Sequence, residues 1–140
     1  MVSITQDTLH VRTSGRGFTD ITAVAQSFAI DCPVQTGTLT AFIHHTSASL
    51  ILCENADPQV LRDLESWMQR AVPDGDPLFG HTAEGPDDMP AHVRSVLTAS
   101  SLSLPITHGR IDVGTWQGLY LYEHRIAPHT RRVSLTVIGD

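Results

Sequence analysis

The segment TLTAFIHHTSASLILC, residues 38–53, carries apolar side chains that alternate with the period of two typical of a β-strand. This pattern predicts two strands or one long bent strand. The two faces of the first part are Leu39, Ala41, Ile43 and His45 on one side and Thr40, Phe42 and His44 on the other. Because side chains alternate along a strand, His45 is predicted to point inward and His44 outward.

The rest of the chain is predicted to form short strands and helices around this segment. Strands are predicted at 2–12, 102–107, 111–113, 116–123 and 132–139, and helices at 18–31, 56–73 and 90–99. The turn SGRG at 14–17 precedes the first helix, and a polar loop rich in Gly and Pro occupies 74–90. The pattern predicts a single compact α+β domain over 1–140. We expect a mainly antiparallel sheet of about seven strands with two or three helices packed on it.

The clearest helix is the one expected at 56–73. Asp57 is a good N-cap, Pro58 suits the first helical position, and apolar residues recur at helical spacing. Asp63 falls on the flank of this apolar stripe, where partial burial is expected.

The charge composition excludes several classes of partner and mechanism. Fifteen acidic residues oppose nine basic ones, for a net charge of −6, which argues against nucleic acid or an anionic membrane as the main partner. All nine basic residues are arginine, so no Schiff-base, pyridoxal or Walker lysine exists. A phosphate group would be bound by arginine, backbone N–H groups or a metal ion.

Cysteine usage and the N-terminal segment indicate a cytoplasmic protein with reduced thiols. Cys32 and Cys53 form neither a CxxC pair nor a disulfide framework. The first residues, MVSITQDTLHVRT, lack a basic and then apolar signal pattern, and no apolar run is long enough to span a membrane.

Three histidines are candidates for a metal site: His45 at the strand end, His81 in the long loop and His92 in the helix predicted at 90–99. The positive end of the helix dipole favours a neutral ring at His92, and a neutral imidazole is what a metal requires. Three such rings can form an open site that leaves a position for water or substrate. Their spacing matches no local zinc motif, so separate surface or core histidines remain the alternative.

Acidic residues and a glycine-rich segment supply further candidates. Glu123 is either a functional carboxylate or the partner of an arginine such as Arg110 or Arg132. The candidate carboxylates are Glu54, Asp57, Asp63, Asp87, Asp88 and Glu123, and helix capping is the alternative for Asp57 and Asp88. The stretch HGRIDVGTWQG, 108–118, allows Arg110 and backbone N–H groups to hold an anion. The alternative is a strand–turn–strand corner with Trp116 in the core.

The chain resembles the YjbQ-like family, described as secondary thiamine-phosphate synthases, over nearly its whole length. The shared motifs are HTSASL (45–50), ENADPQVLRDLE (54–65), His81, DDMPAH (87–92), Gly109 with Arg110, GTWQG (114–118), Glu123 and RRVSLTVIG (131–139). The resemblance implies a homotrimer of compact α+β subunits with sites near subunit contacts. It also implies that His45, His81 and His92 converge on a divalent metal, with zinc favoured. Two departures from the family pattern, Met89 and Cys53, bear on substrate preference.

The leading hypothesis is an enzyme that joins hydroxymethylpyrimidine diphosphate to thiazole phosphate and releases pyrophosphate, as the resemblance implies. Its expected catalytic residues are Glu123, Asp63 and Arg110. The expected substrate-binding residues are Arg110, Gly114, Thr115, Trp116, Gln117, Glu54 and Asn55. Magnesium suits a diphosphate substrate, whereas histidines suit zinc. The alternatives are a zinc-dependent hydrolase or lyase on a small phosphorylated or carboxylated metabolite, and a non-catalytic trimeric metal-binding protein.

Overall fold

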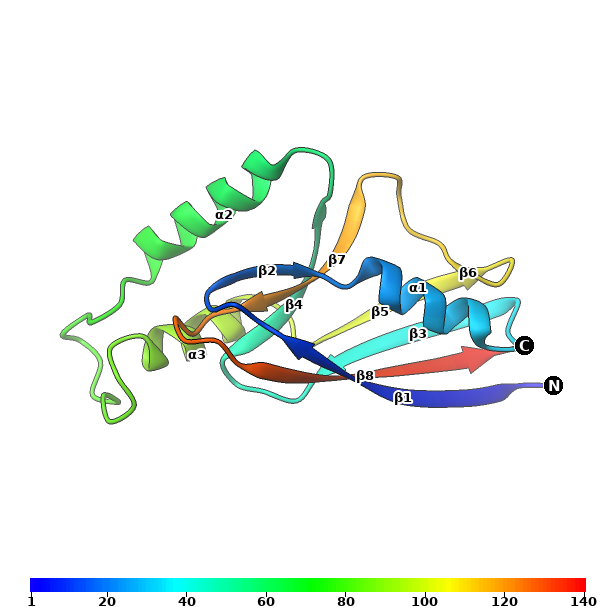
Figure 1. Ribbon diagram of the computed structural model, residues 1–140, viewed down its shortest axis with the longest axis horizontal. Helices are drawn as coiled ribbons and strands as arrows, with labels where there is room; N and C mark the ends of the chain where they lie inside the picture. The colour runs from blue at the N-terminus through cyan, green and yellow to red at the C-terminus, as the bar shows by residue number, and fades with distance from the viewer.

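Eight strands and three helices alternate along residues 1–140, all of which are described by the computed structural model (Figure 1). The elements are β1 (Ser3–Arg12), β2 (Gly17–Asp20), α1 (Thr22–Asp31), β3 (Thr36–Ile43), β4 (Ala48–Glu54), α2 (Pro58–Ala71), α3 (Asp88–Leu97), β5 (Ser101–Thr107), β6 (Arg110–Ile111), β7 (Gln117–Glu123) and β8 (Thr130–Gly139). The strands form a five-stranded sheet, β1-β8-β3-β5-β6, and a three-stranded sheet, β2-β7-β4. All pairings are antiparallel. The predicted α+β class is confirmed, with eight strands in two sheets.

The core lies between the inner faces of the two sheets and α1. Leu39, Ala41 and Ile43 of β3 are at most 2% exposed, as their alternation predicts. Ala25 and Ala29 of α1 are fully buried in the same apolar cluster. The five-stranded sheet and α1 therefore form a rigid base, and the three-stranded sheet continues it toward α2 and α3 (Figure 1).

The segment 38–53 forms two strands that belong to different sheets. β3 ends at Ile43 and β4 begins at Ala48, so residues 44–47 carry the chain from one sheet to the other. His44 is exposed, as predicted, and its Nε2 lies 2.7 Å from the Ser134 hydroxyl. His45 is half-buried and lies beyond the end of the strand. This crossover is the part of the chain that places the candidate site.

The stretch 17–20 is a strand, where the sequence predicts the start of a helix. Gly17–Asp20 pairs with β7, and the Phe18 ring lies 4.0 Å from the Tyr122 ring, centroid to centroid. This long-range pairing outweighs the helical spacing of 18–31. The helix begins only at Thr22, whose N–H donates to the Asp20 carboxylate at 2.9 Å. The helix predicted at 90–99 instead begins two residues earlier than expected, at Asp88.

Helix α2 stands away from the rest of the fold in Figure 1. Asp57 is its N-cap, as predicted, and accepts a 2.9 Å hydrogen bond from the Gln59 N–H. The expected burial of Asp63 is wrong, because this face of α2 meets solvent and Asp63 bonds only to Gln59. The helix is tied down by Glu65, whose carboxylate pairs with the fully buried Arg94 of α3 at 2.6 Å. None of the three helices is both long and apolar enough to cross a membrane.

Candidate metal centre

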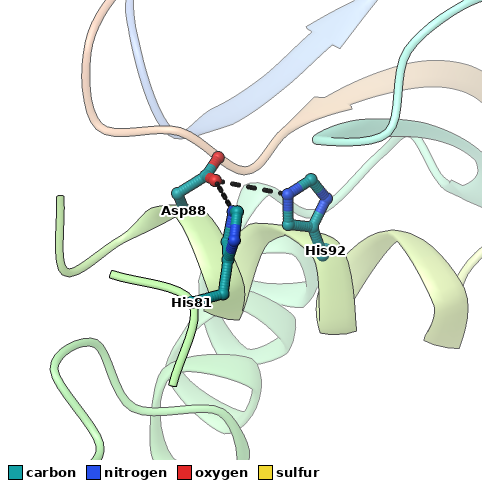
Figure 2. A group of neighbouring side chains, drawn as sticks. All are labelled: His81, Asp88 and His92. Atoms are coloured by element: carbon teal, nitrogen blue, oxygen red, sulfur yellow. Dashed lines mark hydrogen bonds and ion pairs between the residues drawn. The ribbon is translucent and has the colours of Figure 1, made fainter. Parts of the chain in front are cut away.

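Two histidines and one aspartate meet at the start of α3 (Figure 2). Asp88 is the first residue of this helix and His92 follows four residues later, so both side chains lie on one face. His81 comes from the loop between α2 and α3, which closes on itself through a hydrogen bond from the Gly75 N–H to the Pro86 carbonyl. A helix and a closed loop therefore present three metal-ligand side chains to one point.

The three side chains are close enough to share one cation. The Asp88 Oδ2 lies 2.7 Å from His81 Nε2 and 3.3 Å from His92 Nε2. One ligand atom from each residue lies within 4.8 Å of the others. The set has two nitrogen donors and one carboxylate oxygen, which is a ligand set of open, three-ligand zinc sites.

The hydrogen bonding of His92 leaves its Nε2 lone pair directed at this point. Its Nδ1 lies 3.0 Å from the Thr46 carbonyl oxygen, which can only accept, so the proton of a neutral ring sits on Nδ1. Nε2 then faces the Asp88 carboxylate as a second acceptor at 3.3 Å. In the protonated ring, Nε2 donates to the Asp88 carboxylate instead, and a metal cation bound between the two atoms would take the place of that proton.

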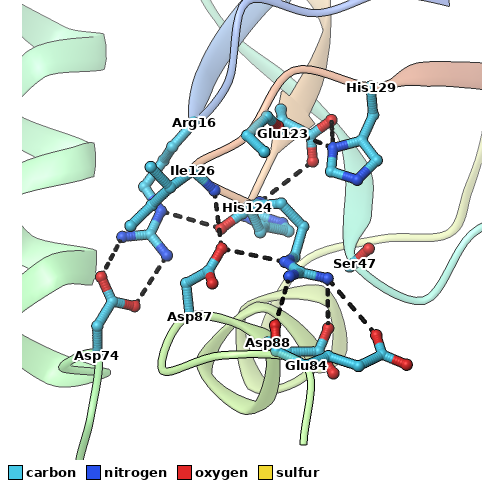
Figure 3. Close-up of polar contacts among 12 residues, drawn as sticks. Arg16, Ser47, Asp74, Glu84, Asp87, Asp88, Glu123, His124, Ile126 and His129 are labelled. Atoms are coloured by element: carbon cyan, nitrogen blue, oxygen red, sulfur yellow. Dashed lines mark hydrogen bonds and ion pairs between the residues drawn. The ribbon is translucent and has the colours of Figure 1, made fainter.

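Asp88 is held in place and ionised by the loop that follows β7 (Figure 3). Its side chain is 4% exposed, and its Oδ1 accepts a 2.9 Å hydrogen bond from Arg125 Nη1. Burial alone raises the pKa of Asp88, but the hydrogen bond with His81 and the charges of His92 and Arg125 lower it below its usual value. Arg125 also donates to the Asp87 carboxylate and to the Glu84 carbonyl. One guanidinium therefore fixes both Asp88 and the end of the loop that precedes it.

The structure does not bring His45 into this group. Its Nε2 accepts a 2.8 Å hydrogen bond from the Arg132 N–H, so the proton of the neutral ring is on Nδ1 and no free lone pair remains for a metal. Burial first, and then the charges of Arg131 and Arg132, lower the pKa of His45. A neutral ring with one free N–H donor is the result.

Glu123 is fully buried and forms an ion pair with Arg131. This corrects the sequence-based choice of Arg110 or Arg132 as its partner. Those two side chains are exposed, while Arg131 is the residue of β8 whose side chain points inward. Burial raises the pKa of Glu123, yet hydrogen bonds from Arg131, Thr13 and the Arg125 N–H lower it overall. In this environment Glu123 is a stabilising anion out of contact with solvent.

The expected substrate-binding residues gather at the other end of β7. Antiparallel pairing of β4 and β7 sets Glu54 opposite Gln117, and Asn55 Nδ2 donates to the Thr115 carbonyl at 3.3 Å. The Trp116 side chain is 64% exposed, which excludes the core position considered for it. Arg110, on β6, and Asp63, on α2, are also exposed. None of these expected site residues belongs to the His81, Asp88 and His92 group.

Asp88 is among the candidate carboxylates, but the sequence did not single it out as a metal ligand, because its place before an apolar helix also suits a cap. The N-cap position belongs to Asp87, and the Asp88 side chain bonds to His81 and Arg125. The signal was the spacing of four residues between Asp88 and His92 in DDMPAH. Met89, one of the departures from the family pattern, lines a cavity of about 330 Å³ together with His81.

Comparison with known proteins places the chain in a family. The sequence profile described as UPF0047 protein YjbQ-like matches residues 7–140. A UPF0047 protein of Synechocystis is 45% identical over 135 residues, covering 96% of this chain and 92% of the relative. The UPF0047 protein YjbQ of Escherichia coli O157:H7 is 44% identical over 136 residues, covering 96% of this chain and 98% of the relative.

Solved structures share the fold. A YbjQ-like protein from Sulfolobus solfataricus P2 superimposes with a TM-score of 0.91 at 18% identity, covering 100% of both chains. A YjbQ/UPF0047 protein from Clostridium acetobutylicum gives a TM-score of 0.82 at 30% identity, covering 95% of this chain and 98% of the other. With sequence and fold in agreement over nearly the whole length, the chain belongs to the UPF0047/YjbQ-like family.

Proposed function

We propose that the protein is a divalent-metal enzyme acting on a small phosphorylated or carboxylated metabolite, with His81, Asp88 and His92 as its metal ligands. The observation that carries this is the convergence of two imidazole nitrogens and one buried carboxylate oxygen, with one ligand atom from each residue within 4.8 Å of the others. When bound, zinc at such a site polarises a substrate oxygen or lowers the pKa of water. Three protein ligands leave a position open, which favours an enzyme over a closed storage site.

The chain's own residues prepare the site for this role. The Thr46 carbonyl fixes the tautomer of His92, and Arg125 orients the Asp88 carboxylate. His81 is the most exposed of the three ligands, with a side chain that is 50% exposed and comes from a loop. Beside it, the cavity lined by Met89 offers space for part of a substrate.

A second candidate is the family-type transferase, a thiamine-phosphate synthase. The carboxylate of Asp88 favours it, because an oxygen ligand suits a magnesium ion bound to a diphosphate better than three imidazoles do. The two candidates differ in the metal that the protein retains. Zinc that survives dialysis supports the first, while weakly held metal with stabilisation by Mg²⁺ and pyrophosphate supports the second.

Metal content tests the proposed centre. We expect protein purified without a histidine tag to hold close to one zinc per chain, and the H92A and D88N variants to lose most of it, because each removes one of only three ligands. Elemental analysis of protein dialysed against metal-free buffer measures this. The matched control is H10A, an exposed histidine of β1, which should retain wild-type metal content. Equal metal in H92A and H10A would overturn the proposed centre.

We also propose that the chain assembles as a homotrimer. The rim formed by Glu54, Asn55 and 114–117 is separated from the metal centre by the length of β7, about 20 Å for its seven residues. One small substrate cannot contact both within one chain, so the two groups can form one site only between neighbouring chains. A groove of about 600 Å³ between β4, α2 and α3 is lined by eleven residues, of which ten are hydrophobic. Trp67 is one of them and is 59% exposed. A second copy is the occupant that would cover this groove.

The mass of the particle in solution tests the assembly. Light scattering after size-exclusion chromatography should give three times the chain mass of 15.3 kDa. A W67E variant places a charge in the groove and should shift the mass toward one chain. R62E changes an exposed residue of the same helix that does not line the groove, and should leave the mass unchanged. A wild-type monomer would contradict the proposed trimer.

A further inference from the structure

A second polar cavity, of about 440 Å³, opens at the crossover between β3 and β4. Its polar lining consists of His44, His45, Thr46, Ser47, Ser100 and Arg131. No carboxylate is among its lining residues, although the chain as a whole carries a net charge of −6. The cavity is therefore a local concentration of hydrogen-bond donors in an acidic protein.

Two of these donors have no acceptor on the chain. His45 uses Nε2 to accept from the Arg132 N–H at 2.8 Å, so its proton is on Nδ1, which bonds to no other group of the chain. The Ser47 oxygen accepts from Arg131 Nη2 at 2.9 Å, which leaves the hydroxyl hydrogen free to donate. Ser47 is only 9% exposed, so its donor faces the cavity edge rather than bulk water.

Two arginines place positive charge near the cavity. Besides burial, the charges of Arg131 and Arg132 lower the pKa of His45, whereas Glu123 opposes them more weakly. Glu123 lies behind the guanidinium of Arg131, to which it is paired, and does not line the cavity. An anion entering the cavity would therefore meet donors and positive potential before it met a negative charge.

We propose that this cavity binds the oxyanion of a small metabolite, a phosphoryl or carboxylate group, with His45 Nδ1 and the Ser47 hydroxyl as donors. Its volume falls within the range of about 300–1,000 Å³ typical of small-molecule sites. The cavity borders the metal centre through Thr46, whose carbonyl oxygen accepts from His92 Nδ1. The proposal rests on the proposed function only for the position of the cavity beside the metal centre, because neither donor needs a metal in order to bind an anion.

Anion titration of metal-free protein tests the proposal. Inorganic phosphate and, separately, acetate are titrated into chelator-treated protein, and binding is followed by calorimetry and by the side-chain ¹H–¹⁵N signals of the histidines. We expect saturable binding with a shift of the His45 signal, and the tighter of the two anions identifies the group. S47A should weaken binding tenfold or more, since a hydrogen bond to a charged group is lost. H45Q keeps an acceptor for the Arg132 N–H but moves the remaining donor from the ring Nδ1 to a side-chain amide in a different position, and should therefore weaken binding.

The control is S103A, which removes an exposed hydroxyl of β5 that does not line the cavity. It should bind phosphate as the wild type does. Wild-type affinity in both S47A and H45Q, or no binding of either anion at 50 mM, would overturn the proposal. Binding lost in H92A but retained in S47A would place the anion at the histidine–aspartate group instead and leave the proposed metal centre standing. Binding at the cavity with no zinc in the native protein would contradict the metal centre alone.

Discussion

Replacing Glu123 by glutamine is expected to lower the free energy of unfolding by about 3–5 kcal/mol, because it leaves a buried guanidinium without its counter-ion. Arg131 is 4% exposed and Glu123 is fully buried. The carboxylate accepts from Arg131 Nε and from the Thr13 hydroxyl, each at 2.8 Å, and from the Arg125 N–H at 3.1 Å. Glutamine keeps the shape of the side chain but offers one acceptor oxygen and no charge. Urea unfolding should register the loss, and the melting temperature should fall by roughly 10–15 °C.

The same variant separates a structural role of Glu123 from a catalytic one. The matched control is D63N, because Asp63 is the other carboxylate expected to act as a base and it is exposed on α2. Its substitution should change stability by no more than about 0.5 kcal/mol. A Glu123→Gln protein as stable as the wild type would show that Glu123 is not the buried counter-ion inferred here.

Stability is expected to fall steeply with acid because of His124, which is fully buried and hydrogen-bonded to Ser49 at 2.8 Å. Its Nδ1 has no partner. Burial first, and then the charges of Arg94, Arg16 and Arg131, lower its pKa to about 3 from 6.5. Between about pH 6.5 and pH 3, His124 therefore binds a proton in the unfolded chain but not in the folded chain. This contribution to stability is complete above pH 6.5 and is lost as the pH falls toward 3.

The size of this effect follows from the linkage relation. Between pH 7 and pH 4, the depressed pKa of His124 accounts for a loss of about 3 kcal/mol. H124Q has no such titration, so its stability should fall less over this range even if it starts lower at pH 7. The control H10Q replaces an exposed histidine and should follow the wild-type curve. Parallel pH curves for the wild type and H124Q, from urea unfolding at each pH, would contradict the assignment.

Local patterns predict this fold well where the conformation of a segment depends on residues close to it in the sequence. The alternation of Leu39, Ala41 and Ile43 marked a strand because every second side chain enters the core. Asp57 and Pro58 marked the start of α2 because capping involves only neighbouring backbone groups. In both cases the information is contained within a few residues.

Predictions failed where distant residues decide the conformation. Helical spacing continues through Phe18, but 17–20 pairs with β7, more than a hundred residues later in the chain. Asp63 lies on the flank of a good apolar stripe, yet this side of α2 faces solvent while Met68 of the same helix is buried. Periodicity cannot report how closely an element approaches its neighbours.

The candidate site also has features that the sequence alone predicts and features that only the folded structure shows. The residue types, the neutral ring expected at His92 in its helix and the absence of lysine chemistry all follow from the order of amino acids. The family follows as well, because its motifs are short and ordered. In contrast, three assignments depend on folding: Asp88 as the partner of both His81 and His92, Arg131 as the counter-ion of Glu123, and Arg132 as the donor that occupies His45. The reason is physical, since a hydrogen bond requires atoms within about 3 Å, and only the packing of loops and sheet ends sets which distant groups come that close.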